Sequence, residues 1–154
     1  MDEFPGASPQ WTVEYDTDGD FARFVARLGD YERAVLVAAI EKVLSRYGLD
    51  ICQSEWGRPL KGGLYEFRIR RSLRTILNEY GSEASPSVRV LPDRPVLLRV
   101  FCTFYGSRVV LLLGGYDKKK DPSERRQARE IKRARRALHE WSSTRSRGAQ
   151  RRHE

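Results

Sequence analysis

The strand pattern of residues 97–115 constrains the fold of this chain more than any other feature. In residues 97–106 ("LLRVFCTFYG") two sets of side chains alternate, so the sets face opposite sides of a strand. One face carries Leu98, Val100, Cys102 and Phe104, and the other carries Arg99, Phe101 and Thr103. A Gly106-Ser107 turn and the apolar run "RVVLLLGG" (108–115) follow, and together these segments predict a β-hairpin.

The same alternation in residues 64–70 ("LYEFRIR") predicts a third strand. Tyr65, Phe67 and Ile69 fall on one face of it, and Glu66, Arg68 and Arg70 fall on the other. Three adjacent strands then form an antiparallel meander with one apolar face and one charged face. We expect the charged face to remain uncovered and to present Glu66, Arg68, Arg70 and Arg99.

Helical periodicity dominates the first third of the chain. Residues 10–15 ("QWTVEY") predict a short strand, and Thr17 is placed to cap a helix whose apolar side chains end at Leu28. A second helix is predicted from Asp30 to Gly48, because glycine favours helix termination. Two helices covering one face of the meander give an α+β fold. Its order is strand, helix, helix and three-stranded meander in a small antiparallel sheet, followed by a basic C-terminal helix.

The terminal helix has a clear predicted start. Asp121 and Pro122 suit the N-cap and the first helical position, and the helix is expected to end near Trp141. Its apolar stripe is narrow and half alanine, which predicts weak docking on the sheet. The stripe consists of Ala128, Ile131, Ala134, Leu138 and Trp141.

The chain length fits a single domain, which we place at residues 10–141. Residues 1–9 are predicted to be a flexible N-terminus, and residues 142–154 a disordered basic tail. Residues 71–95 are predicted to be an insertion, with either a short helix followed by a loop rich in Ser, Gly and Pro, or an extension of the preceding strand. The longest apolar run, 109–113, is too short to cross a bilayer, and the two cysteines lack a C-x-x-C spacing. A cytoplasmic protein is therefore expected.

The basic charge is concentrated at the C-terminal end. Residues 118–154 contain 14 Lys or Arg against 5 Asp or Glu, a net +9, which leaves 15 against 16, or −1, for residues 1–117. Clustered cations favour a polyanionic partner because they release counterions from a phosphate backbone. A solubilising helix face and a disordered tail explain the same charge equally well.

A concave basic patch is predicted where the sheet meets its loops. It consists of Arg68, Arg70 and Arg99 on the strands, Lys61 in the preceding loop, and Lys118, Lys119 and Lys120 after the last strand. Such a patch neutralises phosphate oxygens and stabilises the charge of a pentavalent transition state, so it suits RNA cleavage by the RNA's own 2'-hydroxyl. Arginine does not deprotonate near neutrality, but a lysine crowded by arginines has a lowered pKa and can act as the base.

The neighbouring side chains suggest supporting roles. Glu66 is expected to orient the arginines, and Phe101 and Tyr116 are placed to stack on bases. Each residue also has a structural explanation: the arginines can pair with Glu66 on an exposed sheet face, the lysines can lie in a solvated turn, and both rings can cap the sheet edge. No phosphate-binding glycine loop and no metal-ligand grouping is seen in the sequence, so no cofactor or metal is expected.

The order of these elements, with "LKGGLYEFRIR", "LLRVFCTFYGSRVVLLLGGYDKKKDPSE" and "EIKRARRAL", resembles the RelE superfamily of toxins from toxin-antitoxin pairs. The phage-related branch that includes HigB-like toxins is the most similar, over residues 10–70 and 97–141. The resemblance implies a metal-independent ribonuclease that cuts mRNA, commonly on the ribosome, and that pairs with a helix-turn-helix antitoxin. It also implies working roles for Arg68, Arg70, Arg99 and the lysines at 118–120.

Two features set this chain apart from that pattern, and the fold by itself does not establish nuclease activity. Residues 71–95 stand where the family usually has a short connection, and the terminal helix has no tyrosine, a residue with which some members stack on the substrate. Relatives that inhibit gyrase cleave nothing. A non-catalytic binder of nucleic acid or protein is therefore the alternative, and a decayed phage remnant is a third possibility.

Overall fold

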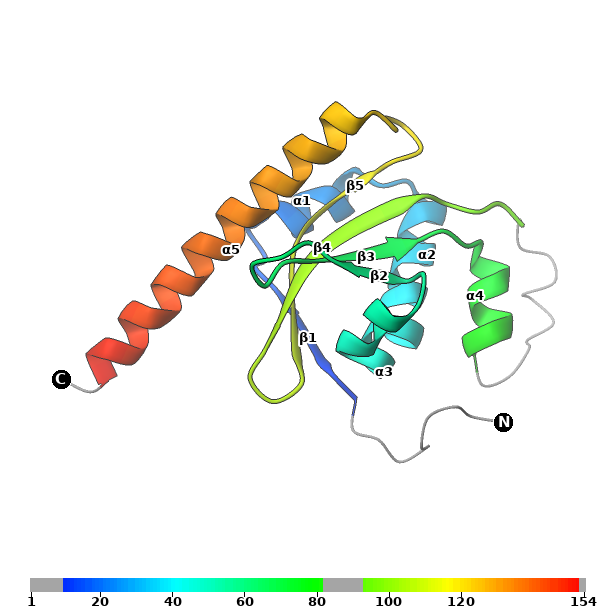
Figure 1. The fold of residues 1–154 in the computed structure, drawn as a ribbon. Coiled ribbons are helices and arrows are strands. Elements are labelled where there is room, and N and C mark those ends of the chain that lie inside the picture. The colour runs from blue at the N-terminus through cyan, green and yellow to red at the C-terminus, as the bar shows by residue number, and fades with distance from the viewer. Residues whose placement is uncertain (1–9, 82–92, 153–154) are drawn as a thin grey trace.

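A five-stranded sheet forms the centre of the molecule. The computed structural model describes residues 10–81 and 93–152, with side chains placed as far as Ser146. The strands are β1 (Thr12–Tyr15), β2 (Gly57–Pro59), β3 (Tyr65–Ile69), β4 (Leu98–Tyr105) and β5 (Val109–Asp117). They lie in the order β1-β5-β4-β3-β2 (Figure 1), so the α+β class and the three predicted meander strands are confirmed.

The sheet is mixed, and the expectation of an antiparallel sheet is wrong at one edge. β1 pairs with β5 in parallel, with Thr12 opposite Val109, while β2, β3, β4 and β5 pair antiparallel. The long helical connection after β1 allows a parallel pairing that a hairpin would forbid. Strand β2 was not predicted, because its three residues are too few to show an alternating pattern. Its Pro59 is compatible with its position at the edge of the sheet, where a proline does not remove a ladder hydrogen bond.

Helices cover one face of this sheet and enclose the main core. They are α1 (Asp20–Arg27), α2 (Asp30–Ala39), the π-helical turn η1 (Ile40–Leu44), α3 (Ser45–Tyr47), the 3-10 turn η2 (Gly48–Gln53) and α4 (Leu73–Tyr80). Helix α1 begins after Gly19, so Thr17 is not its N-cap. The predicted inward face of β4 is confirmed, since Leu98, Val100 and Cys102 are buried here with Phe67 and Ile69 of β3.

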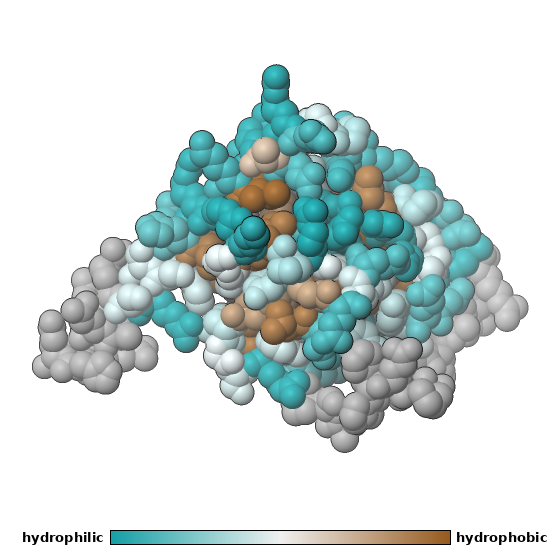
Figure 2. All heavy atoms as spheres, in the orientation of Figure 1, coloured by the Kyte–Doolittle hydropathy of each residue, from teal (hydrophilic) through white to brown (hydrophobic). Residues whose placement is uncertain are grey.

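The other face of the sheet is covered by α5 (Glu124–Arg152), so the expectation of an open charged face is wrong. A second core forms there from Leu64, Phe101, Leu111, Leu113, Tyr116 and Ala134, with Ile131, Ala137, Leu138 and Trp141 packed against it. The predicted apolar stripe makes these contacts except at Ala128, which is exposed. Hydrophobic side chains show only in small separate areas of the face seen in Figure 2.

Helix α5 is longer than its sequence indicates. It continues past Trp141 to Arg152, so residues 142–152 are helical and are not a disordered tail. Figure 1 shows its C-terminal half projecting beyond the sheet. The segment contains three serines, a threonine and a glycine, so its own helix propensity is modest, and propagation from the docked N-terminal half, which adds one hydrogen bond for each residue fixed, accounts for the extension. Among residues 10–81 and 93–152, no helix is long and apolar enough to cross a membrane.

The predicted insertion at 71–95 is described in part. Its helix is confirmed as α4, which is capped by Ser72, whose hydroxyl accepts a hydrogen bond from the Thr75 N–H at 3.2 Å. The predicted loop lies at 82–92, and the flexible N-terminus was predicted at 1–9; both segments lie outside the described residues. The indole N–H of Trp56 donates a hydrogen bond to the Tyr80 hydroxyl at 3.0 Å, and this bond connects α4 to the main core.

Gly48 ends the helical segment as predicted, and its replacement by alanine should be costly. Its φ is +52°, and a Cβ atom there would meet the Trp11 ring at 2.0 Å. We expect Gly48→Ala to lower the free energy of unfolding by about 2 kcal/mol or more in urea denaturation, from the backbone strain and the clash together. Gly106→Ala is the matched control, because Gly106 has a φ of +55° and open space around it. Equal losses in the two variants would show that Trp11 moves aside without cost.

Candidate functional site

The sheet register brings charged side chains from three strands onto the face beneath α5. One cross-strand row runs through Arg58, Glu66, Phe101 and Gly114, and the next runs through Arg68, Arg99 and Tyr116. Arg68 and Arg99 are directly opposite each other, an arrangement that is destabilising without a counter-charge. The carboxylate of Glu66, one row away, supplies that counter-charge.

Glu66 is the centre of this site. Its side chain is 1% exposed, and its Oε1 atom lies 3.6 Å from Arg58 Nη2, 3.7 Å from Arg68 Nε and 3.8 Å from Arg99 Nε. We call Arg58, Arg68 and Arg99 around Glu66 the arginine cluster. The predicted convergence of Arg68 and Arg99 beside Glu66 is therefore present in the structure. Gln127 of α5 also donates from Nε2 to Glu66 Oε2 at 3.3 Å.

Several buried polar atoms of the cluster have no hydrogen-bond partner among the described residues. They are Glu66 Oε1, Arg68 Nε, Arg99 Nε and the Tyr116 hydroxyl. Buried polar groups are nearly always satisfied, so it is informative that the Nε atoms of Arg68 and Arg99 pair with Glu66 Oε1 at 3.7 and 3.8 Å, beyond hydrogen-bond distance. Three guanidinium groups and one carboxylate also leave an excess of positive charge. The cluster therefore has the donors and the charge to hold an additional anion, with a phosphate oxygen as a suitable acceptor.

The arginines differ in how far they reach the surface. The side chain of Arg99 is 3% exposed, that of Arg68 25% and that of Arg58 47%. Burial lowers the pKa of Arg99, and the nearby carboxylate of Glu66 opposes that effect. An approaching anion therefore meets Arg58 and Arg68 first, while Arg99 lies beneath α5.

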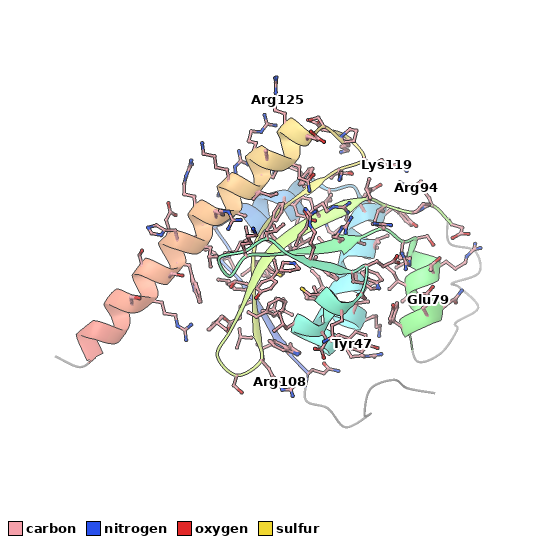
Figure 3. All side chains as sticks on the ribbon, viewed as in Figure 1. Tyr47, Glu79, Arg94, Arg108, Lys119 and Arg125 are labelled. Atoms are coloured by element: carbon pink, nitrogen blue, oxygen red, sulfur yellow. The ribbon has the colours of Figure 1, made fainter. Side chains whose placement is uncertain are left out.

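Of the three lysines after β5, Lys118 lies near the arginine cluster, and Lys119 and Lys120 lie away from it. The pKa of Lys118 is lowered by partial burial and then by the charges of Arg99, Arg68 and Arg58. Lys119, labelled in Figure 3, instead donates from Nζ to the Pro95 carbonyl at 3.4 Å. Lys120 is exposed, and its charge helps to lower the pKa of Glu32. Lys118 therefore combines a lowered pKa with proximity to the arginine cluster.

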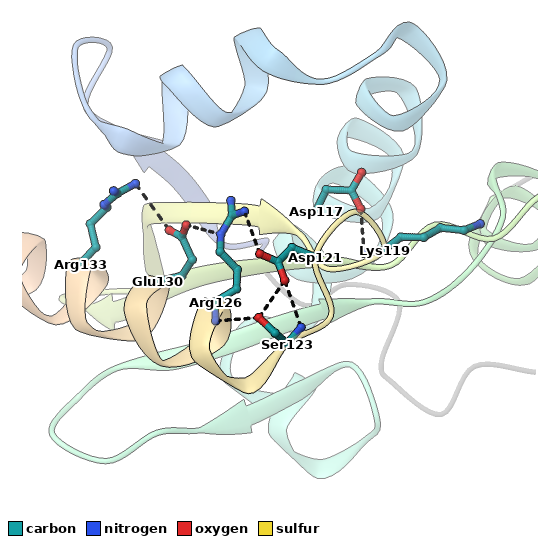
Figure 4. A network of polar contacts seen from close by, with 7 residues as sticks. All are labelled: Asp117, Lys119, Asp121, Ser123, Arg126, Glu130 and Arg133. Carbon is teal, nitrogen blue, oxygen red and sulfur yellow. Dashed lines mark hydrogen bonds and ion pairs between the residues drawn. The ribbon is translucent and has the colours of Figure 1, made fainter.

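The first turn of α5 is held by a polar network (Figure 4). The Ser123 hydroxyl accepts a hydrogen bond from the Arg126 N–H at 3.1 Å, so Ser123 is the N-cap. The prediction of Asp121 at this position is wrong, since Asp121 Oδ1 accepts hydrogen bonds from the Ser123 N–H and hydroxyl, before the helix begins. Arg126 pairs with buried Glu130 at 2.7 Å and lies over the Tyr116 ring, 5.2 Å from its centroid. The Ser123 and Glu130 contacts order the first turns of α5, and the Arg126 contact with Tyr116 places them over the sheet.

Four other predicted site residues do not lie as the sequence predicted. Phe101 and Tyr116 are each 1% exposed and stack on each other with ring centroids 6.2 Å apart, so α5 shields both from an RNA base. Lys61 is exposed in the β2–β3 turn, and its carbonyl accepts from Arg135 Nη1 at 2.9 Å. Arg70 is exposed past the end of β3 and contributes only to the field at Arg99 and Glu55. Residue alternation gave the face of Phe101 and could not show that α5 covers it.

Sequence reasoning missed two contributors, Arg58 and Gln127. Arg58 is opposite Glu66 in the β2–β3 pairing, so recognition of β2 as a strand would have placed it at the site. Gln127 reaches the site from α5 across 61 residues of chain, and no local pattern signals that contact.

The fold and the site together define an α+β protein in which a long basic helix covers a buried carboxylate ringed by arginines. No protein-family model and no curated protein matches the chain. Among the residues that the structure describes, no three His, Cys, Asp or Glu side chains group as metal ligands.

Proposed function

We propose that the chain is the toxin of a toxin-antitoxin pair and cleaves RNA by attack of the 2'-hydroxyl, without a metal ion. The single observation that carries the proposal is the arginine cluster, whose unpartnered donors lie beside a lysine of lowered pKa. The resemblance to the RelE superfamily adds ribosome-bound mRNA as the substrate and a helix-turn-helix protein as the inhibitory partner. Both remain parts of the proposal.

The chemistry assigns one role to each group. Arg58 and Arg68 bind the scissile phosphate, and Arg99 stabilises the charge that develops on it. Neutral Lys118 removes the proton of the 2'-hydroxyl, whose oxygen attacks phosphorus and expels the 5'-oxygen. The Tyr116 hydroxyl, whose pKa is raised by burial, stays protonated and gives its proton to that leaving oxygen. The products are a 2',3'-cyclic phosphate and a free 5'-hydroxyl.

This reaction requires the first turns of α5 to move when RNA binds. Arg99 is 3% and Tyr116 1% exposed, and the Gln127 bond to Glu66 and the Arg126 contact with Tyr116 cover them. Opening breaks the Gln127 bond, which has a charged acceptor and contributes about 1.5–3 kcal/mol, and the Arg126 contact with Tyr116, which contributes about 0.5–2 kcal/mol. A rigidly fixed α5 would prevent cleavage.

The burial of Arg99 favours a second candidate, a non-catalytic binder. In that case Arg58, Arg70 and Lys118 form only an electrostatic surface for a nucleic acid. Binding would then weaken steeply with salt, because each phosphate contact releases a counterion.

Cleavage of free RNA in the presence of EDTA, and of mRNA in a translating extract that keeps its Mg²⁺, tests the proposal. Purified protein is incubated with free mRNA and with a translating extract, and the ends are mapped by primer extension. We expect cuts with 2',3'-cyclic phosphate ends that disappear in Arg68→Ala and persist in Arg129→Ala, a matched change on the exposed side of α5. Salt-dependent RNA binding without cuts in either reaction would instead establish the binder.

A further inference from the structure

A groove between α1 and α5 forms a second feature of the molecule, away from the arginine cluster. It encloses about 440 Å³ over β5. Its floor is apolar, formed by Phe21, Leu111 and Leu113, with Ala137 and Trp141 of α5 along one wall. A narrower hollow continues it between the same two helices, and the two share Asp20, Arg23 and Leu113. The groove is therefore elongated, as a bound chain segment requires.

The rim of the groove carries the opposite charge to the rest of the chain. Its lining includes four carboxylates, Asp16, Asp18, Asp20 and Glu140, and one cation, Arg23. Arg23 is already engaged, since it pairs with Asp20 at 2.5 Å and donates to the Asp18 carbonyl at 2.6 Å. A net charge of −3 at this groove contrasts with +8 for the whole chain. Nucleic acid is repelled from such a rim, and basic side chains are attracted to it.

We propose that this groove binds a basic, amphipathic segment of a partner protein. Apolar side chains of the segment enter the groove over Leu111 and Leu113 and beside Ala137, and flanking Lys or Arg side chains pair with Asp16, Asp18 and Glu140. Charge complementarity selects a basic segment over an acidic one, and the apolar floor selects an amphipathic one over a purely charged one. The proposal does not depend on RNA cleavage, because none of the groove residues belongs to the arginine cluster.

Fluorescence anisotropy with two labelled peptides tests the charge requirement. In one peptide leucine alternates with lysine, and in the other leucine alternates with glutamate. We expect the lysine peptide to bind the full chain and the glutamate peptide not to bind. Absence of binding by the lysine peptide, or equal binding of the two, would overturn the proposal.

Paired variants then place the binding in the groove. The double variant Asp16→Asn with Asp18→Asn removes two charges from the rim. The new amide oxygen at position 16 can still accept the hydrogen bond from the backbone N–H of residue 18. We expect roughly threefold to thirtyfold weaker binding of the lysine peptide. Glu41→Gln with Asp50→Asn is the control, since both residues are exposed carboxylates outside the groove. An equal loss in the control pair would show that only the overall charge matters.

A second pair of variants tests the apolar floor. Ala137→Lys places a long cation inside the groove, and Ala128→Lys places the same side chain on an exposed position of the same helix. We expect Ala137→Lys to abolish peptide binding and Ala128→Lys to leave it unchanged, with both variants helical by circular dichroism. Retained binding in Ala137→Lys would overturn the proposal. A wild-type chain that dimerises and thereby excludes the peptide would also overturn it, because a second copy would then fill the groove.

Discussion

Replacing Lys118 by methionine is expected to lower the rate of RNA cleavage by about 10²- to 10⁴-fold, the usual contribution of a positioned base. Methionine keeps an unbranched apolar stem and removes the amine. Because partial burial and three arginines lower the pKa of Lys118, its neutral form accumulates at a lower pH than for an ordinary lysine. The measurement is the single-turnover rate of cleavage of a defined RNA as a function of pH.

The pH profile and the neighbouring lysines provide the controls. A base works in its neutral form, so the wild-type rate should rise with pH until the lowered pKa of Lys118 is passed and then level off. That rise should disappear in Lys118→Met. Lys119→Met and Lys120→Met should cleave at nearly the wild-type rate, since neither side chain joins the arginine cluster. A variant Lys118→Met that cleaves normally, with the same pH profile, would remove Lys118 from the mechanism.

Replacing Glu66 by leucine is expected to lower the free energy of unfolding by about 3–5 kcal/mol, the usual cost of breaking a buried ion pair from one side. The carboxylate is 1% exposed and its three neighbours are guanidinium groups, of which Arg99 is 3% exposed. Without Glu66, the charge of Arg99 is left buried beside that of Arg68, which is directly opposite it on the sheet. Urea denaturation followed by circular dichroism measures the loss.

Two further variants separate the buried charge from the lost side chain. Glu79→Leu, on an exposed position of α4, should change the free energy of unfolding by less than about 0.5 kcal/mol. Glu66→Leu combined with Arg99→Met should recover much of the loss, because an apolar pair of similar volume replaces a buried ion pair at little cost. If Glu66→Leu alone is as stable as the wild type, Arg99 is solvated in the variant and the cluster is open to water.

The local patterns of the chain were sufficient for β1, β3, β4 and β5, but not for β2, and they gave the faces of the side chains on β3 and β4. The alternation in "LYEFRIR" and "LLRVFCTFYG" placed Phe67, Ile69, Leu98 and Val100 on one face and Glu66, Arg68 and Arg99 on the other, as the structure has them. Side chains on a strand point to opposite faces whatever lies around it, so this information is contained in a few consecutive residues. The helix termination at Gly48 is local for a similar reason, since a left-handed backbone conformation favours glycine.

What covers each face was decided only by the tertiary structure. The stripe Ile131, Ala134, Ala137, Leu138 and Trp141 packs on Leu64, Phe101, Leu111 and Leu113, and this packing buries Glu66 and Arg99. The sequence pattern of α5 describes an apolar stripe without naming the surface that it meets. Tertiary packing also decided three other features. It paired β1 with β5, placed Arg58 opposite Glu66, and put Lys118 but not Lys119 or Lys120 near the arginine cluster. Each depends on residues far apart in the chain, where contact is set by how whole elements pack and not by the spacing of neighbouring residues.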